Sequence, residues 1–192
     1  MVVGGLGPPT TYWFFKWYTN RVKAVYVLRH AEKDASGALT ENGKRLAKQQ
    51  GGILPKFAVV IASHSPRTIE TAAHITGEEP ATDDRAGYYH TLQEISDDIA
   101  KLVAEKSITF LEAAEIYNDG QLAAGIQAQA AGLNDLIDEI FVGLNDGEKA
   151  LVVSHDMTMT PALVLRGQPR PFVDYLSGYV IRDDGTVSLI AS

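Results

Sequence analysis

Three apolar runs along the chain each end abruptly in basic or histidine side chains. The runs cover residues 24–28, 57–62 and 149–153, and each is short and rich in valine and alanine. Short apolar runs of this kind predict buried strands of a sheet whose two faces are covered. The carboxyl ends of parallel strands meet at one edge of the sheet, where open α/β sheets bind their ligands. We therefore expect the side chains that follow the runs to converge at that edge: Arg29, His30, Arg67 and His155.

Helix signals follow the first two runs. Thr40 is suited to cap a helix that ends at about Leu54, just before a proline. Ser65 is suited to cap a second helix, because Pro66 then takes the first helical position, where its missing N–H costs nothing. We expect this second helix to continue over residues 67–76, which places Arg67 in its first turn.

The rest of the chain continues the alternation of helices and strands. Residues 77–91 are rich in loop-forming residues, with a short strand expected near Tyr88 and Tyr89. The segments at 178–182 and 186–190, separated by Asp183-Asp184-Gly185, predict a hairpin. The element order predicts an α/β fold: a three-layer α/β/α sandwich with a mostly parallel central sheet. Apolar spacing predicts further helices over about 95–105, 109–117, 121–144 and 157–165.

The composition narrows the function classes. Of 192 residues, 45% are hydrophobic and 21% are charged, which is typical of a globular protein. The formal net charge of −7 argues against nucleic-acid binding, because proteins of that class present a basic face. The chain has no cysteine, so thiol catalysis is excluded. Its five histidines form no His-Glu-x-x-His or similar cluster, so we expect neither a metal nor another cofactor.

An aromatic segment precedes the first strand. Residues 12–18, Tyr-Trp-Phe-Phe-Lys-Trp-Tyr, hold both tryptophans, but the run is far shorter than the about 20 apolar residues that span a bilayer. It also lacks the basic region and the cleavage site of a signal peptide. We therefore expect a cytoplasmic protein, with an exported form as the alternative, and a chain that consists of an aromatic N-terminal segment or leader (1–23) and a single domain (24–192). Contact of residues 12–18 with a membrane or a second copy is the lesser alternative, and the oligomeric state stays open.

Two arginines and two histidines at one sheet edge favour phosphate chemistry. Arginine stays charged and binds phosphate oxygens with two parallel hydrogen bonds. A helix that begins beside the site adds backbone N–H groups and the positive end of its dipole. An imidazole in such a site can attack phosphorus, which divides a difficult displacement into two steps. The second imidazole can stabilise the charge of the group in transfer.

These residues lie in four motifs that resemble those of the histidine phosphatase superfamily, which includes cofactor-dependent phosphoglycerate mutases and many phosphatases. The order of the motifs matches that of the superfamily, and the resemblance covers roughly residues 24–190. It implies a phosphoglycerate mutase-like fold. The matching segments are Leu28-Arg29-His30, Leu39-Thr40-Glu41-Asn42-Gly43, Ser63-His-Ser-Pro-Arg67-Thr-Ile-Glu-Thr71-Ala72, and Val152-Val153-Ser154-His155.

The resemblance implies a role for each residue of the site. His30 would be the nucleophile that becomes phosphorylated. Arg29, Arg67 and His155 would complete the phosphate pocket, with His155 also acting in catalysis. His64, which lies in the same motif as Arg67, would lie at the rim of the pocket or in solvent.

The resemblance also implies a general acid, for which the chain offers two carboxylates. In the mutase branch the acid is a glutamate in a Leu-x-Glu segment, which Leu92-Gln93-Glu94 matches. In the acid phosphatase and phytase branch it is an aspartate directly after the second histidine, which corresponds to Asp156. We rank Glu94 first, because the chain lacks the long inserted domain of the second branch. The simpler alternatives are a solvated loop carboxylate at Glu94 and a helix N-cap at Asp156.

Two departures from the superfamily pattern favour a phosphatase over a mutase. Residues 31–34 read Ala-Glu-Lys-Asp where many members have glycine and later threonine and asparagine, and residues 95–98 read Ile-Ser-Asp-Asp. Mutases use these regions to hold a bisphosphorylated sugar acid. We expect a metal-independent phosphomonoester hydrolase of the histidine acid phosphatase type, acting on a phosphorylated small molecule or a phosphoprotein. The alternatives are a phosphoglycerate mutase-type phosphotransferase and a non-catalytic module that binds a phosphorylated ligand.

Overall fold

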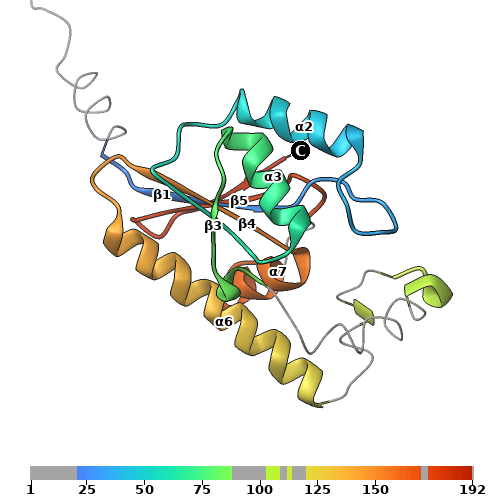
Figure 1. Ribbon diagram of the computed structural model, residues 1–192. Helices are drawn as coiled ribbons and strands as arrows, with labels where there is room; N and C mark the ends of the chain where they lie inside the picture. Colours follow the sequence, from blue (N-terminus) through green and yellow to red (C-terminus); the bar gives the residue numbers. More distant parts are fainter. Residues whose placement is uncertain (1–20, 88–102, 109–111, 114–119, 170–172, 192) are drawn as a thin grey trace, which may run out of the picture.

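The computed structural model describes residues 21–87, 103–108, 112–113, 120–169 and 173–191. Within these residues the centre is a six-stranded sheet in the order β3-β2-β4-β1-β5-β6 (Figure 1). Five of the predicted strands are confirmed to within two residues at their ends, and β3 is an additional strand that the sequence did not predict. The strands are β1 (Ala24–Arg29), β2 (Val59–Ala62), β3 (Ala81–Thr82), β4 (Lys149–Ser154), β5 (Gly178–Arg182) and β6 (Val187–Ile190).

The register of the parallel strands brings their carboxyl ends to one edge of the sheet. β1 and β2 both run parallel to β4, with Arg29 opposite Ser154 and Ala62 opposite Val153. The three segments that follow these strands therefore start side by side, as the sequence predicts. β5 and β6 form the expected antiparallel hairpin, and β5 pairs with the free side of β1.

Helices cover both faces of the sheet, which confirms the three-layer arrangement (Figure 1). α2 (Glu41–Gly51) and α3 (Pro66–Thr76) lie on one face. α6 (Gly120–Gly143) and α7 (Asp156–Leu165) lie on the other. Because successive side chains of a strand point to opposite faces of the sheet, each strand contributes side chains to the contacts with both helix layers.

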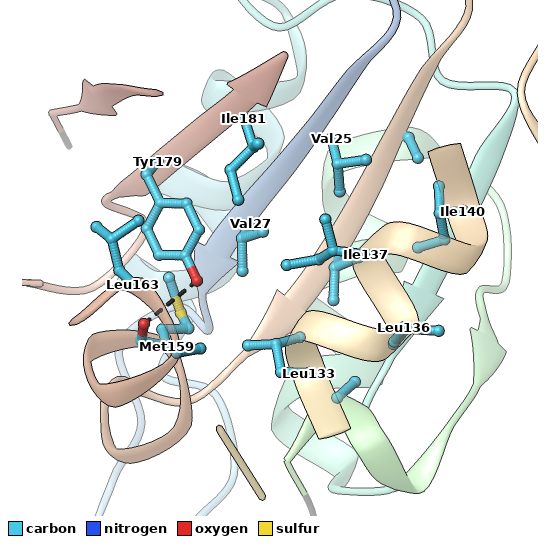
Figure 2. Close-up of a cluster of buried hydrophobic side chains, with 14 of the residues drawn as sticks. Val25, Val27, Leu133, Leu136, Ile137, Ile140, Met159, Leu163, Tyr179 and Ile181 are labelled. Atoms are coloured by element: carbon cyan, nitrogen blue, oxygen red, sulfur yellow. Dashed lines mark hydrogen bonds between the residues drawn. The ribbon is translucent and has the colours of Figure 1, made fainter. Parts of the chain in front are cut away.

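Two apolar clusters join these layers. Figure 2 shows Val25 and Val27 of β1 facing the apolar side of α6, where Leu133 and Ile137 are fully buried. Tyr179 of β5 closes this cluster, and its hydroxyl donates a 3.2 Å hydrogen bond to a backbone carbonyl of α7. The second cluster packs the opposite face of the sheet against α2 and α3. The sheet is thus buried on both sides, which fixes the positions of the strand ends.

Capping residues and a glycine determine where α2 and α3 begin and how closely the two helices approach. The Thr40 hydroxyl accepts a 2.9 Å hydrogen bond from the backbone N–H of Gly43, so the predicted N-cap of α2 is confirmed. Ser65 occupies the N-cap position of α3, but its side chain makes no capping hydrogen bond, which differs from the sequence prediction. α2 approaches α3 closely because Gly51 has no side chain; a Cβ there would overlap the carbonyl oxygen of Ile75.

One predicted loop contains regular structure. Residues 77–91 include β3 and a 3-10 helix, η1 (Asp84–Ala86). β3 consists of two residues that pair with β2. A strand this short shows no alternation of apolar and polar residues in the sequence, so it could be found only from its contact with β2. The strand expected near Tyr88 and Tyr89, most of the helices expected over 95–105 and 109–117, and the aromatic segment 12–18 lie outside the described residues. Among the helices that are described, none combines the length and the apolar character needed to cross a membrane.

Candidate active site

The four residues singled out by the sequence converge at the carboxyl edge of the sheet. Arg29 is the last residue of β1, and His30 follows it directly. His155 follows β4 and is the N-cap residue of α7, while Arg67 lies in the first turn of α3. The two imidazole rings are buried, with centroids 5.3 Å apart and planes inclined by 63°. The predicted convergence is therefore confirmed.

His30 is held in one tautomer by the backbone that follows it. Its Nδ1 lies 2.8 Å from the carbonyl oxygen of Ala31. A carbonyl only accepts hydrogen bonds, so Nδ1 carries the proton and Nε2 keeps its lone pair. The Ala31 N–H in turn donates to the Thr71 hydroxyl, which ties the loop to α3. Burial, together with the charges of Arg67 and Arg29, lowers the pKa of His30 to about 3. The ring is therefore neutral at pH 7, the form that can act as a nucleophile.

His155 sits between a guanidinium and a buried hydroxyl. Its Nδ1 lies 3.3 Å from Nη2 of Arg67, and its Nε2 lies 2.9 Å from Oγ of Ser63. Burial lowers the pKa of His155 well below its ordinary value, and the positive charge of Arg67 lowers it further. Both histidines of the site are thus neutral when no anion is bound.

The two arginines are oriented from different sides. Arg29 donates a 2.9 Å hydrogen bond to the carbonyl of Val173 and lies 3.4 Å from the carboxylate of Asp156. The Tyr175 ring stacks on the Arg29 guanidinium, 4.4 Å from ring centroid to Cζ. Within the part of the chain that the structure describes, the buried Nε–H groups of Arg29 and Arg67 have no hydrogen-bond partner. Unpaired buried donors are costly, and an oxyanion bound between guanidinium groups is well suited to accept from them.

The charge of the site is positive although the chain as a whole is acidic. Arg29 and Arg67 contribute two positive charges, Asp156 contributes one negative charge, and the two histidines are neutral. Burial lowers the pKa of Arg67, but an arginine starts so high that its charge is kept. The site therefore attracts anions, although the chain as a whole carries a formal net charge of −7.

The structure places Asp156 in the site but not at the N-cap. The N-cap residue of α7 is His155, and Asp156 is the first helical residue. One carboxylate oxygen accepts a 3.0 Å hydrogen bond from the N–H of Met157, and the other pairs with Arg29. The N-cap alternative for Asp156 is therefore wrong: the helix begins one residue earlier than the sequence pattern indicates.

Glu94 lies outside the described residues, but the segment that leads towards it begins beside α7. Gly87 has a φ of +111°, and a Cβ there would lie 2.6 Å from the Thr158 hydroxyl oxygen and 3.2 Å from that of Ser154. The Ser154 hydroxyl also donates a 2.6 Å hydrogen bond to the Ala86 carbonyl. Only glycine allows the backbone to pass this close to the first turn of α7.

Two residues of the site were not predicted from the sequence. Ser63 contacts His155 through its hydroxyl, and its position directly after β2 was the available signal. Tyr175 packs against His30, with ring centroids 5.6 Å apart. It comes from the loop before β5, where nothing in the local sequence distinguishes it from other tyrosines. His64, expected at the rim or in solvent, is half-exposed and lies 3.3 Å from the carboxylate of Asp84 in η1.

Comparison with solved structures identifies the fold. The chain is similar to phosphoglycerate mutase from Bacillus anthracis, with 19% identity over 91% of this chain and 95% of that chain, at a TM-score of 0.61. It is similar to YhfR of Bacillus stearothermophilus, with 23% identity over 87% of this chain and 95% of that chain, at a TM-score of 0.60. A phosphoserine phosphatase mutant from Entamoeba histolytica matches with 18% identity over 88% of this chain and 95% of that chain, at a TM-score of 0.58.

These matches confirm the resemblance to the histidine phosphatase superfamily at the level of the fold. The matched structures are members of that superfamily, and their fold is the phosphoglycerate mutase-like fold expected from the sequence. No family model matches the sequence, and comparison with curated proteins finds no match. The assignment of chemistry to the chain therefore rests on the geometry of its own side chains.

Proposed function

We propose that the protein is a phosphomonoester hydrolase that works through a phosphohistidine intermediate on His30. The observation that carries this proposal is the state of His30. The ring is neutral, its proton is fixed on Nδ1 by the Ala31 carbonyl, and within the described residues its Nε2 lone pair has no hydrogen-bond donor. A nucleophile in this state lies next to Arg29 and Arg67, the residues best suited to hold a phosphoryl group.

The first step transfers the phosphoryl group to the protein. Nε2 of His30 forms a bond to phosphorus while the bond between phosphorus and the leaving oxygen breaks. The leaving oxygen takes a proton from a general acid and departs as an alcohol. In the second step water attacks phosphorus, the P–N bond breaks, and the same carboxylate takes a proton from the water. Inorganic phosphate and neutral His30 are regenerated.

The cationic side chains stabilise both steps. Charge accumulates on the equatorial oxygens of the group in transfer, and fixed guanidinium donors in a buried site oppose it without reorganisation. His155 contributes once it holds a proton, because an imidazolium can donate to the same oxygens.

Two carboxylates remain candidates for the general acid. Asp156 lies in the site and pairs with Arg29, so it needs to release that pair in order to protonate a leaving group. Glu94 is the first choice from the resemblance, and Gly87 lets its segment start beside α7. We propose Glu94 as the acid and Asp156 as the residue that orients Arg29.

The substrate class proposed is a phosphate monoester, carried by a small molecule or by a protein. The similar structures include a phosphoglycerate mutase and a phosphoserine phosphatase, so the fold alone is compatible with either chemistry. The departures at residues 31–34 and 95–98 support hydrolysis rather than mutase chemistry in this chain.

Hydrolysis of 4-nitrophenyl phosphate by the purified protein tests the proposal. We expect His30→Ala to abolish turnover and His74→Ala, a change on α3 away from the site, to preserve it. We also expect EDTA to leave the rate unchanged. Equal rates for the wild type and His30→Ala would show that His30 is not the nucleophile.

A further inference from the structure

A continuous chain of hydrogen bonds runs from His155 into the start of α3. Nε2 of His155 lies 2.9 Å from Oγ of Ser63, and that oxygen lies 2.8 Å from Oγ1 of Thr68. Thr68 Oγ1 lies 2.7 Å from the carbonyl oxygen of Ser65. Ser63 and Thr68 are fully buried, and each is in contact with the next member of the chain.

The two ends of this chain fix its direction. At one end, Arg67 lies against Nδ1 of His155 and can only donate, so Nδ1 accepts and the ring proton sits on Nε2. At the other end, the Ser65 carbonyl can only accept, so the Thr68 hydroxyl donates to it. Ser63 then accepts from His155 and donates to Thr68, and every group in the chain is satisfied.

The opposite tautomer does not fit this arrangement. A proton on Nδ1 of neutral His155 would face the donors of Arg67, so that contact would lose its hydrogen bond. A lost partner in a buried site is costly, because water cannot replace it. The hydroxyls act in the same sense. An Nε2 without a proton would need Ser63 to donate to it, and because the Thr68 proton is on the Ser65 carbonyl, the 2.8 Å contact between Ser63 and Thr68 would then lose its hydrogen bond.

We infer that Ser63 is a positioning residue, which keeps the proton of neutral His155 on Nε2 and leaves the lone pair of Nδ1 on the side of Arg67. Nδ1 is then the atom that takes up a proton from solvent when an anion binds beside Arg67. Arg67 then donates to the anion instead of to Nδ1, and His155 becomes an imidazolium that donates from Nδ1 to the anion and from Nε2 to Ser63. That the anion is a phosphoryl group rests on the proposed function. The tautomer of His155 in the absence of an anion does not depend on that function.

The charged and titratable groups around His155 agree with this account. Arg67 from α3, and Arg29 and His30 from the end of β1, all oppose a positive charge on the ring when the site is empty. Asp156, the next residue on its own helix, pairs with Arg29, and Tyr175 from the loop before β5 packs against Arg29 and His30. A bound dianion offsets the two guanidinium charges, which removes the main opposition to protonation.

Nitrogen NMR of protein labelled with ¹⁵N-histidine tests the inference in the ligand-free state at pH 7. The Nδ1 and Nε2 shifts of a histidine report its tautomer directly, and the His155 signals are assigned by their loss in His155→Asn. We expect the Nε2–H form in the wild type. Ser63→Ala leaves the buried Nε2–H without its acceptor, although Arg67 still donates to Nδ1, so we expect the share of the Nδ1–H form to rise. We expect Ser63→Thr, which keeps the hydroxyl, to restore the Nε2–H form.

A matched control is available two residues further along. Ser65→Ala removes a buried hydroxyl that makes no capping hydrogen bond, so we expect it to keep the wild-type tautomer. If Ser63→Ala does not fold, Thr68→Val replaces it. This substitution removes the acceptor of the Ser63 hydroxyl, which can then donate to Nε2, so we expect the share of the Nδ1–H form to rise here as well.

Inorganic phosphate and turnover give the second readout. In the wild type we expect saturating phosphate to produce the doubly protonated ring. In Ser63→Ala we expect kcat for 4-nitrophenyl phosphate to fall about ten- to a hundredfold, as for residues that orient a histidine ligand. An Nδ1–H form in the wild type, or an unchanged tautomer in Ser63→Ala, would overturn the inference. The predicted tautomers without any hydrolysis would instead overturn the proposed function and leave the role of Ser63 intact.

Discussion

His30 and His155 face each other across the carboxyl edge of the sheet, with ring centroids 5.3 Å apart. They come from the ends of two adjacent parallel strands, so the register of β1 and β4 sets their separation. Both rings are buried and neutral, and each has one nitrogen tied to a group outside the anion site. The remaining nitrogens are the ones available for attack and for donation.

The pairing of two buried neutral histidines predicts a loss of stability in acid. The pKa of His30 is lowered to about 3 in the folded protein, against 6.5 when it is unfolded, and that of His155 is lowered as well. The unfolded chain therefore binds protons first as pH falls below about 6.5, and the free energy of unfolding decreases by up to about 1.4 kcal/mol per pH unit for each histidine.

Urea unfolding at pH 7.5, 6 and 5 measures this slope. We expect His30→Asn to show a shallower decrease than the wild type, because it removes one of the two groups. His74→Asn, on α3 and outside the site, serves as the matched variant and should keep the full slope. A wild-type stability that is constant between pH 7.5 and 5 would contradict the assignment of neutral rings.

Arg67→Lys tests whether the guanidinium geometry matters beyond its charge. Lysine keeps the positive charge but loses the two parallel donors and the contact with Nδ1 of His155. We expect kcat/KM for 4-nitrophenyl phosphate to fall about 10²–10³-fold, the usual effect of removing one fixed donor from an anionic transition state. Arg45→Lys, on the exposed side of α2, should be neutral. A minor effect of Arg67→Lys would reduce its role to long-range attraction.

The leaving group of the substrate distinguishes the two candidate acids, because only substitution of the true acid slows poor leaving groups more than good ones. A missing acid slows an alkyl phosphate, whose leaving oxygen needs a proton, far more than 4-nitrophenyl phosphate. We expect Glu94→Gln to show this difference, with a loss of about 10²–10⁴-fold on the alkyl ester. Asp156→Asn should slow both substrates equally, because it removes only the ion pair with Arg29. The reverse pattern would make Asp156 the acid.

Gly87 offers a test of the close approach beside α7. Gly87→Ala combines a positive φ with an overlap against the Thr158 hydroxyl, whereas Gly77→Ala has a positive φ and open space. We expect the second change to cost about 1 kcal/mol from backbone strain alone, and the first to cost about 1–3 kcal/mol more. Thermal unfolding compares them. Equal losses would mean that the contact with Thr158 imposes no constraint.

The sequence predicted the parts of the site that depend on strand ends. Arg29, His30 and His155 follow uninterrupted apolar runs, and the end of each run marks the end of a buried strand. Arg67 was predictable because Ser65-Pro66 marks the start of a helix, although the Ser65 side chain does not cap it.

Other parts depend on contacts between distant segments. Nothing in the local sequence indicates that the Ser63 hydroxyl meets His155 or that the Tyr175 ring covers Arg29. β3 forms only because β2 lies beside it, and Asp156 joins Arg29 only because β4 extends to Ser154. Each depends on how separate elements pack, which hydrophobic periodicity does not encode.

The most direct test of the central claim is capture of the phosphoryl group on His30. The protein is mixed with ³²P-labelled phosphate monoester, denatured in alkali within milliseconds, digested and analysed by mass spectrometry. We predict a phosphate on the peptide that contains His30, stable in alkali and labile in acid, which is absent in His30→Ala and present in His74→Ala. Turnover with no label on that peptide, or label that persists in His30→Ala, would contradict the account.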